Sequence, residues 1–368
     1  MAPGPPLQVR RGEELRIRLF NDLPEPTAVH WHGVRLANAM DGAPPLTQSS
    51  IASGESFEYR IIAPDAGTYF YHPPYEIQDS GQMRRHLYGA LIVAETEPVD
   101  VDRDQTLIFA APRGPDSTTN SPPRDDAPVK VNGAASFDIH ARPNDRLRLR
   151  LINATDSRIF GLRIAGLRTF VMATDGEPAE PFVAREGHLL LGPGNRIDVF
   201  IDCALAPGDI APILIDGGDA DVPIARIVCD AAAASRAAPR DEPQALPPNP
   251  LPERMNFAAA FRFDAAIGRP APRQAGHGIA PLFTVKRNRT IVLGVSNPTP
   301  ENRFIHLHGH HFRLLDIHDD GWKPFWLDTL PIAPGGNARI AFVADNLGKW
   351  LIDGLTGETD ALTWFEVA

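Results

Sequence analysis

Cysteine is nearly absent from this chain of 368 residues, which contains only Cys203 and Cys229. Two thiols are too few for a disulfide framework or a cysteine-rich zinc site. Each ends an apolar run typical of a strand, Ile197–Cys203 and Ile224–Cys229. Because neither has a histidine nearby in the sequence, we expect buried neighbouring thiols or one disulfide, and no metal-binding role.

Long apolar runs and excess positive charge are also missing. No stretch has the length of a membrane span, so we expect none. The formal net charge of −10 argues against nucleic acid or an anionic membrane as a main partner. The first residues do not have the pattern of a signal peptide, so an export signal would lie upstream of Met1 or have been removed.

Proline and glycine are abundant, with 37 and 30 residues, and short alternating apolar runs lie between them. This combination predicts an all-β chain of many strands joined by turns. The length suits two or three domains of about 100–150 residues each.

One pattern recurs three times, in residues 9–33, 142–166 and 285–309: a basic turn, an alternating strand, an asparagine with a turn, and a second strand ending in glycine. Three copies predict three similar β-domains. The first and third copies end in His30-Trp31-His32-Gly33 and His306-Leu307-His308-Gly309. In the middle copy Arg163 and Ala165 replace the paired histidines, so we expect a spacer domain without ligands.

The domain boundaries follow from composition. We predict a first domain at 1–98, a second at 99–230 and a third at 252–368. Residues 231–251 are rich in alanine and proline, which is typical of a linker. Residues 114–126 are predicted to form a surface loop.

A second pattern, a turn that ends in glycine, follows each copy at residues 51–54, 191–194 and 332–335. In the first and third domains a strand beginning with glycine comes after it, so the two domains can be aligned. Counting from Gly67 and Gly348, His72 corresponds to Asp353. Side chains two apart on a strand point to one face, so each His-x-His pair aims two imidazoles the same way. If the two domains pack through equivalent faces, six candidate metal ligands converge: His30, His32, His72, His306, His308 and Asp353. Such a site suits Cu, Zn, Fe or Ni, and copper binds most tightly in this series.

A single histidine on a strand is more often a core or surface residue, but two matched pairs favour metal binding. His86 could be a compensating ligand, although a solvated residue is the simpler interpretation. His310 and His311 are expected to pack or to orient His308. We expect a purely structural role for the remaining residues. They are His140, His188, His277 and His318, the loop carboxylates Glu358 and Asp360, and the core aromatics Trp350 and Trp364.

Several motifs together resemble the multicopper oxidase family, which includes the laccases. They are His30–Gly33, Asn38-Ala39-Met40-Asp41-Gly42, Tyr71-His72-Pro73, Leu87–Val93, Ala173-Thr174-Asp175-Gly176 and His306–His310. The similarity covers nearly the whole chain. It implies three consecutive cupredoxin-like Greek-key β-domains and copper as the cofactor.

The resemblance also implies roles for the histidines. His30 and His306 would bind the type 2 copper, and His32, His308 and His72 the type 3 coppers. The family expects a further histidine two positions after His72, where this chain has Pro74.

The larger departure concerns the type 1 copper. Where the family has a His-Cys-His motif, this chain reads Asp353-Gly354-Leu355, and Arg303 replaces the remaining type 1 histidine. Blue copper requires a cysteine thiolate with two histidines. The resemblance therefore implies one or two copper ions, no type 1 centre and no ordinary laccase turnover.

Three functions stay open at this point. The chain could be a copper-dependent oxidoreductase acting with a small-molecule reductant and O₂. It could bind copper for sequestration or delivery without catalysis. It could also be a copper-free scaffold like the superfamily members involved in bacterial cell division. The resemblance implies a periplasmic or secreted location.

Overall fold

The computed structural model describes residues 3–74, 82, 87–111, 128–155, 157–217, 220–252, 254–268, 280–317, 324–355 and 362–368. In these ranges the chain is mostly strands joined by loops, which confirms the all-β class. The helical elements described are single 3-10 turns: η1 (Asn38–Met40), η4 (Arg185–Gly187) and η5 (Phe257–Ala259). Within these ranges, no helix is long and apolar enough to cross a membrane.

The first domain contains two sheets. The larger has the order β1 (Leu7–Arg10), β6 (Gly89–Ala94), β5 (Gly67–His72) and β3 (His30–His32). The smaller pairs β2 (Glu14–Phe20) with β4 (Ser56–Ile62). Exposed side chains alternate with half-buried ones along β2 and with half-buried or buried ones along β4, as expected of a sheet with one solvated face.

The second domain also contains two sheets. One has the order β13 (Glu177–Val183), β12 (Thr169–Thr174), β15 (Arg196–Asp202), β10 (Arg146–Asn153), β7 (Arg103–Ala110) and β8 (Lys130–Val131). The other has the order β14 (His188–Leu191), β11 (Phe160–Ile164), β16 (Ile210–Ile215), β17 (Val222–Cys229) and β9 (Phe137–Ala141).

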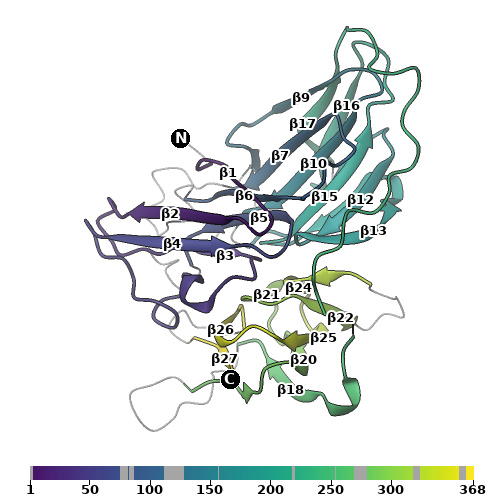
Figure 1. Cartoon of the computed structure of the whole chain (residues 1–368). Coiled ribbons are helices and arrows are strands. Elements are labelled where there is room, and N and C mark those ends of the chain that lie inside the picture. The colour runs from purple at the N-terminus through teal and green to yellow at the C-terminus, as the bar shows by residue number, and fades with distance from the viewer. Residues whose placement is uncertain are drawn as a thin grey trace.

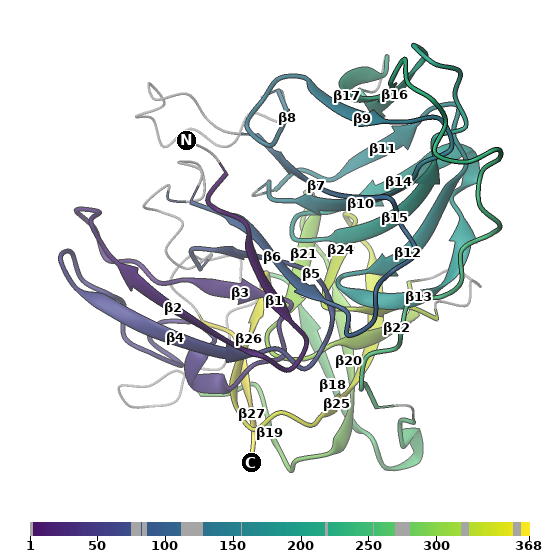
Figure 2. The same cartoon turned by 45° about the horizontal axis from the view of Figure 1, so that its top comes forward.

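The third domain repeats this arrangement. One sheet has the order β18 (Phe261–Ala266), β20 (Arg289–Ser296), β25 (Asn337–Ala344), β22 (Phe312–Asp316) and β23 (Trp326–Leu327). The other has the order β19 (Thr284–Val285), β27 (Trp364–Val367), β26 (Gly348–Asp353), β21 (Arg303–Leu307) and β24 (Thr329–Ile332). Figures 1 and 2 show the first domain, in purple, beside the second, in teal, with the third, in green to yellow, packed against both.

The three domains share one pairing scheme. Strand β2 pairs antiparallel with β4, β10 with β15, and β20 with β25. In the same way β3 pairs with β5, β11 with β16, and β21 with β26. The last strand of each domain runs parallel to an early one: β6 to β1, β17 to β9, and β27 to β19. The threefold repeat read from the sequence is therefore confirmed.

The register shows which residues correspond. His72 lies opposite His30, and Asp353 lies opposite His306. The predicted correspondence of His72 with Asp353 is thus confirmed. In the middle domain Leu214 lies opposite Arg163. A leucine and an arginine therefore stand where the outer domains carry histidine or aspartate.

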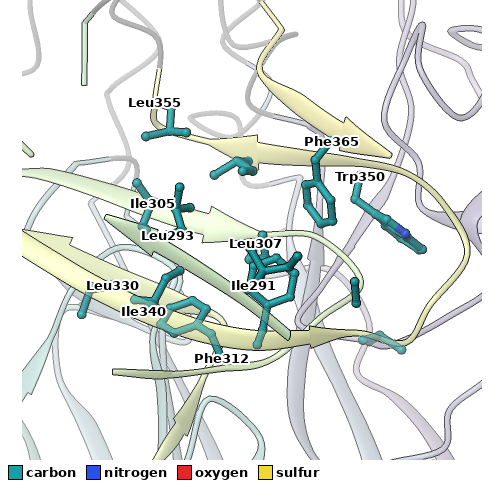
Figure 3. Close-up of a cluster of buried hydrophobic side chains, with 14 of the residues drawn as sticks. Ile291, Leu293, Ile305, Leu307, Phe312, Leu330, Ile340, Trp350, Leu355 and Phe365 are labelled. Atoms are coloured by element: carbon teal, nitrogen blue, oxygen red, sulfur yellow. The ribbon is translucent and has the colours of Figure 1, made fainter. Parts of the chain in front are cut away.

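Strand alternation separates the core from the histidines. Trp31 and Leu307 belong to one buried cluster that extends through the first and third domains. Figure 3 shows Leu307 among the core side chains of the third domain, with Ile291 and Phe312 nearby. Their flanking histidines point to the opposite face, where the two domains meet. Trp350 lies in the same core, as expected.

The second domain has its own core, which contains both cysteines. Cys203 and Cys229 are buried free thiols, so of the two alternatives the thiols are observed. Burial raises the pKa of the Cys203 thiol to about 12, which keeps it protonated and unreactive at neutral pH.

The predicted linker has no regular structure, but it is held against the rest of the molecule. Leu246 is buried in a small cluster with Phe170 and Phe200 of the second domain. The Asn249 side chain accepts a hydrogen bond from the Ala66 amide and donates one to the Ala66 carbonyl, each at 2.8 Å. This segment therefore ties the first and second domains together before the chain enters the third.

A buried ion network joins the first and second domains. The Asp198 carboxylate accepts hydrogen bonds from Arg148 at 2.6 Å, from Arg150 at 3.3 Å and from the Thr68 hydroxyl of the first domain at 2.6 Å. Burial opposes ionisation of Asp198, but the two guanidinium groups outweigh it and lower its pKa. The carboxylate is therefore a shared anion for two buried cations.

We expect Asp198→Ala to lower the free energy of unfolding by about 2–4 kcal/mol, because it removes the anion shared by two buried guanidinium groups. Arg148 then keeps only Glu95 and Arg150 only Asp104 as carboxylate partners. Urea denaturation measures the change. The control is Asp138→Ala, which removes an exposed carboxylate paired with Arg226 and should change stability little. Equal destabilisation by the two substitutions would contradict the assignment.

Candidate metal centre

The five predicted histidines lie together between the first and third domains. Strand β3 carries His30 and His32, β5 ends at His72, and β21 carries His306 just before His308. Each of the five is at most 1% exposed. His30 Nε2 lies 3.1 Å from His306 Nε2, and His32 Nδ1 lies 3.1 Å from His72 Nε2. Two ring stacks, His30 on His308 and His32 on His306, complete the cluster.

The hydrogen-bond partners of the first pair determine its tautomers. His30 Nδ1 lies 2.9 Å from the Asp41 carbonyl oxygen, and His306 Nδ1 lies 3.1 Å from that of Asp328. A carbonyl only accepts, so each Nδ1 carries the proton and donates. In the neutral rings the Nε2 atoms would therefore face each other with unshared lone pairs at 3.1 Å.

In the second pair, His32 and His72, other hydrogen bonds likewise leave two unprotonated nitrogens facing each other. His72 Nδ1 donates to the Pro73 carbonyl at 2.8 Å, which leaves its Nε2 without a proton. The Thr329 hydroxyl donates to Asp328 Oδ1 at 2.7 Å, so it can only accept from His32 Nε2 at 2.8 Å. His32 Nδ1 is then the bare nitrogen that faces His72 Nε2.

Two facing lone pairs at this distance repel each other unless a cation lies between them. Burial lowers the pKa values of His32 and His72, and that of His306 to about 4, so a proton is not the favoured cation at neutral pH. Neutral imidazole is the metal-binding form. Metal–nitrogen bonds of about 2.0–2.1 Å place two ligands of one ion at about this separation. The donor set therefore fits a transition-metal ion at each pair.

His308 differs from the other four. Its Nδ1 lies 2.9 Å from Asp41 Oδ2, and its Nε2 lies 3.0 Å from Asp353 Oδ2. Burial opposes a charged ring, but the two carboxylates outweigh it and raise the pKa of His308. With both nitrogens donating, His308 is an imidazolium held between two anions.

The second domain contributes no histidine to this cluster, but it orients the pairs. Arg196 donates to both carboxylate oxygens of Asp328, at 2.8 and 2.5 Å. Asn195 donates to the Thr329 carbonyl at 3.0 Å. A Cβ at Gly194 would lie 2.7 Å from His32 Cε1, so only glycine fits there. Through these contacts the spacer domain fixes the groups that bond His32 and His306.

Sequence reasoning missed the residues that support the cluster. Asp41 lies in a motif that carried the family resemblance, so a signal for it existed. Asp328, Thr329 and Arg196 stand in no motif that was recognised, and their role depends on contacts between domains. The structure alone reveals them.

The other singled-out residues lie elsewhere. His140 is exposed and pairs with Asp230 at 2.8 Å, and His188 is also exposed. His310 Nδ1 lies 3.1 Å from the His308 carbonyl. Trp364 is buried, as expected. Residues outside the described part of the chain are His86, His277, His318, Glu358, Asp360 and the predicted loop at 114–126.

The position expected for a blue-copper cysteine is occupied by Gly354. Its backbone has a φ of +82°, and a Cβ there would lie 1.8 Å from the Phe304 carbonyl oxygen. A side chain at this position would therefore require the backbone to move. Arg303, in the place of a type 1 histidine, is partly exposed and pairs with Glu301.

We expect Thr329→Val to weaken copper binding about 10- to 100-fold, because it removes the acceptor that sets the His32 tautomer. Calorimetric titration of the metal-free protein measures the affinity. The matched control is Thr290→Val, which removes a buried hydroxyl that accepts from the Asn256 amide. Unchanged affinity in the Thr329 variant, with the control also unchanged, would refute this role.

Known proteins resemble this chain along most of its length. Three family models described as multicopper oxidase match residues 1–98, 94–209 and 247–353. Multicopper oxidase MmcO of Mycobacterium tuberculosis is 30% identical, over 95% of this chain and 78% of that protein. Laccase-8 of rice (Oryza sativa subsp. japonica) is 26% identical, over 76% of this chain and 56% of its own length.

Solved structures of multicopper oxidases have the same fold. The crystal structure of a multi-copper oxidase from Pseudomonas thermotolerans superposes with a TM-score of 0.88 at 29% identity, covering 100% of this chain and 92% of that one. The matched models follow one another along the chain in the order of its three domains. The chain belongs to the multicopper oxidase family.

Proposed function

We propose that this chain is a copper-binding oxidoreductase of the multicopper oxidase family, with its copper between the first and third domains and no type 1 centre. His30 and His306 hold one ion in the type 2 position, and His32 and His72 hold a second. The facing lone pairs of these two histidine pairs are the observation that carries the proposal. Copper in such a site supplies one-electron redox chemistry.

The number of ions follows from the state of His308. The family resemblance gives this residue a type 3 role, but its two nitrogens are engaged by Asp41 and Asp353. An imidazolium has no lone pair to offer a metal. This favours one or two coppers per chain over three.

The absence of a type 1 centre is supported by the surroundings of Gly354. Its positive φ and its contact with Phe304 leave no space for a thiolate side chain. The two cysteines are buried in the core of the second domain. Among the described residues, no cysteine belongs to a cluster that could hold a metal ion.

Without that centre, copper held by these histidines would take electrons directly from a small-molecule reductant, with O₂ as the acceptor. The residues around the cluster bind the ions and exclude bulk water, since all five imidazoles are buried. A periplasmic or secreted location belongs to this proposal through the family resemblance.

The same burial favours a second candidate, copper sequestration or delivery without turnover. Catalytic metal sites keep an open position for substrate, whereas structural sites are closed. Here all five imidazoles of the described cluster are covered by protein. A copper-free scaffold is the third possibility, and the paired lone pairs count against it.

The decisive experiment measures copper content, the EPR spectrum and copper-dependent O₂ uptake with a panel of phenolic and metal-ion donors. We expect one or two coppers per chain, a type 2 signal without intense blue absorption, and O₂ uptake that His306→Ala abolishes. The control is His140→Ala, which alters an exposed histidine outside the cluster.

Each alternative outcome has a distinct meaning. Copper binding without turnover on any donor would establish the sequestration candidate. A thiolate-type blue signal would overturn the absence of a type 1 centre. If the wild-type protein binds no copper, the copper-free scaffold is the function that remains.

We expect Asp353→His to raise the copper content by about one ion per chain, because it releases His308 from its carboxylate clamp and adds a family-like imidazole. Metal analysis after copper loading and desalting measures the change. Asp345→His, on a half-buried carboxylate outside the cluster, is the control. An unchanged copper content in Asp353→His would show that the clamp does not limit the number of ions.

A further inference from the structure

A second buried cluster lies where all three domains meet. Asp65 comes from the first domain, just before β5, Glu177 begins β13 of the second, and His311 precedes β22 of the third. All three are buried, and one potential ligand atom from each lies within 4.8 Å of the others. No residue of this trio belongs to the two histidine pairs described above.

Two atoms of this cluster are left without a hydrogen-bond partner. Glu177 Oε2 accepts from the Asn249 amide of the linker at 3.0 Å, but Glu177 Oε1 has no partner. His311 Nε2 lies 3.6 Å from Glu177 Oε1 and donates to the Asp175 carbonyl at 3.3 Å. In a neutral His311 ring the lone pair is therefore on Nδ1, which has no hydrogen-bond partner. Burying unsatisfied polar atoms is costly, and a cation bound by both atoms would offset that cost.

The surrounding charges lead to the same conclusion. The described part of the junction contains four buried carboxyl groups, Asp65, Asp175, Glu177 and Asp328. The guanidinium groups that pair with them are the buried Arg196 and the half-buried Arg35. Burial raises the pKa of Glu177 to about 7, because its negative charge is poorly compensated. Burial opposes a charged His311 ring, but Glu177 and Asp328 outweigh it and raise the pKa of His311; the resulting imidazolium supplies only one further positive charge.

We propose that Glu177, His311 and Asp65 form a site for a divalent cation of the zinc class, distinct from the copper pairs, which ties the three domains together. One imidazole and two carboxylates are a donor set that zinc accepts, with bonds of about 2.0–2.2 Å. Both Asp65 oxygens also accept hydrogen bonds from Arg35, at 2.7 and 2.8 Å. Glu177 and His311 are therefore the principal ligands, and Asp65 shares its charge between the cation and Arg35.

The test exposes copper-loaded, full-length protein to Zn²⁺, removes free metal by desalting, and measures zinc and copper content and the melting temperature. We expect one additional zinc per chain and a higher melting temperature, because a ligand bound only by the folded state stabilises it. Glu177→Gln and, independently, His311→Gln should lose the zinc and the temperature shift while copper content stays unchanged.

A matched control separates binding from stability. Asp198→Asn alters an equally buried carboxylate of the second domain, outside the trio, and should lower the melting temperature yet retain the zinc. Absence of the additional zinc in the wild-type protein, or its retention in both Glu177→Gln and His311→Gln, would overturn the proposal. A protonated His311 would then be the only added cation at the junction.

Discussion

The apposition of unshared imidazole lone pairs is the constraint on which the metal centre depends. The ring nitrogens of His30 and His306 come from opposite ends of the chain and stand 3.1 Å apart, with their protons committed to backbone carbonyls. Neutral rings gain nothing from this contact by themselves. A metal ion converts it from repulsion to ligation, so metal binding strengthens the contact between the first and third domains.

The middle domain carries no ligand, but its side chains hold the groups that hydrogen-bond to the ring nitrogens facing away from the metal site. Arg196 fixes Asp328, and Asp328 accepts a hydrogen bond from the Thr329 hydroxyl, which directs the Thr329 lone pairs toward His32. A chain of three hydrogen bonds thus transmits the position of one domain to the tautomer of a ring between the other two. Partners of this kind commonly tune a ligand's affinity.

Much of the fold and the histidine set could be predicted from the sequence, because strands and repeats are local patterns. The correspondence of His72 with Asp353 needed only counting from two glycines, and the strand register confirms it. Asp328, Thr329 and the Glu177–His311 junction could not be predicted. Their roles arise from domain packing, and no periodicity or motif spacing records which buried carboxylate faces which ring.

Replacement of an imidazole by Asp353 changes more than one ligand. In this environment a carboxylate at position 353 lies across from Asp41, and the ring between them, His308, becomes their shared cation. The positive charge of an imidazolium then stands where the family resemblance places a metal ligand. Because Asp41 belongs to the first domain, and Asp353 and His308 to the third, this triad holds the two domains together whether or not copper is bound. Such a buried triad stabilises the contact only while all three members are present, since removing one leaves an uncompensated charge.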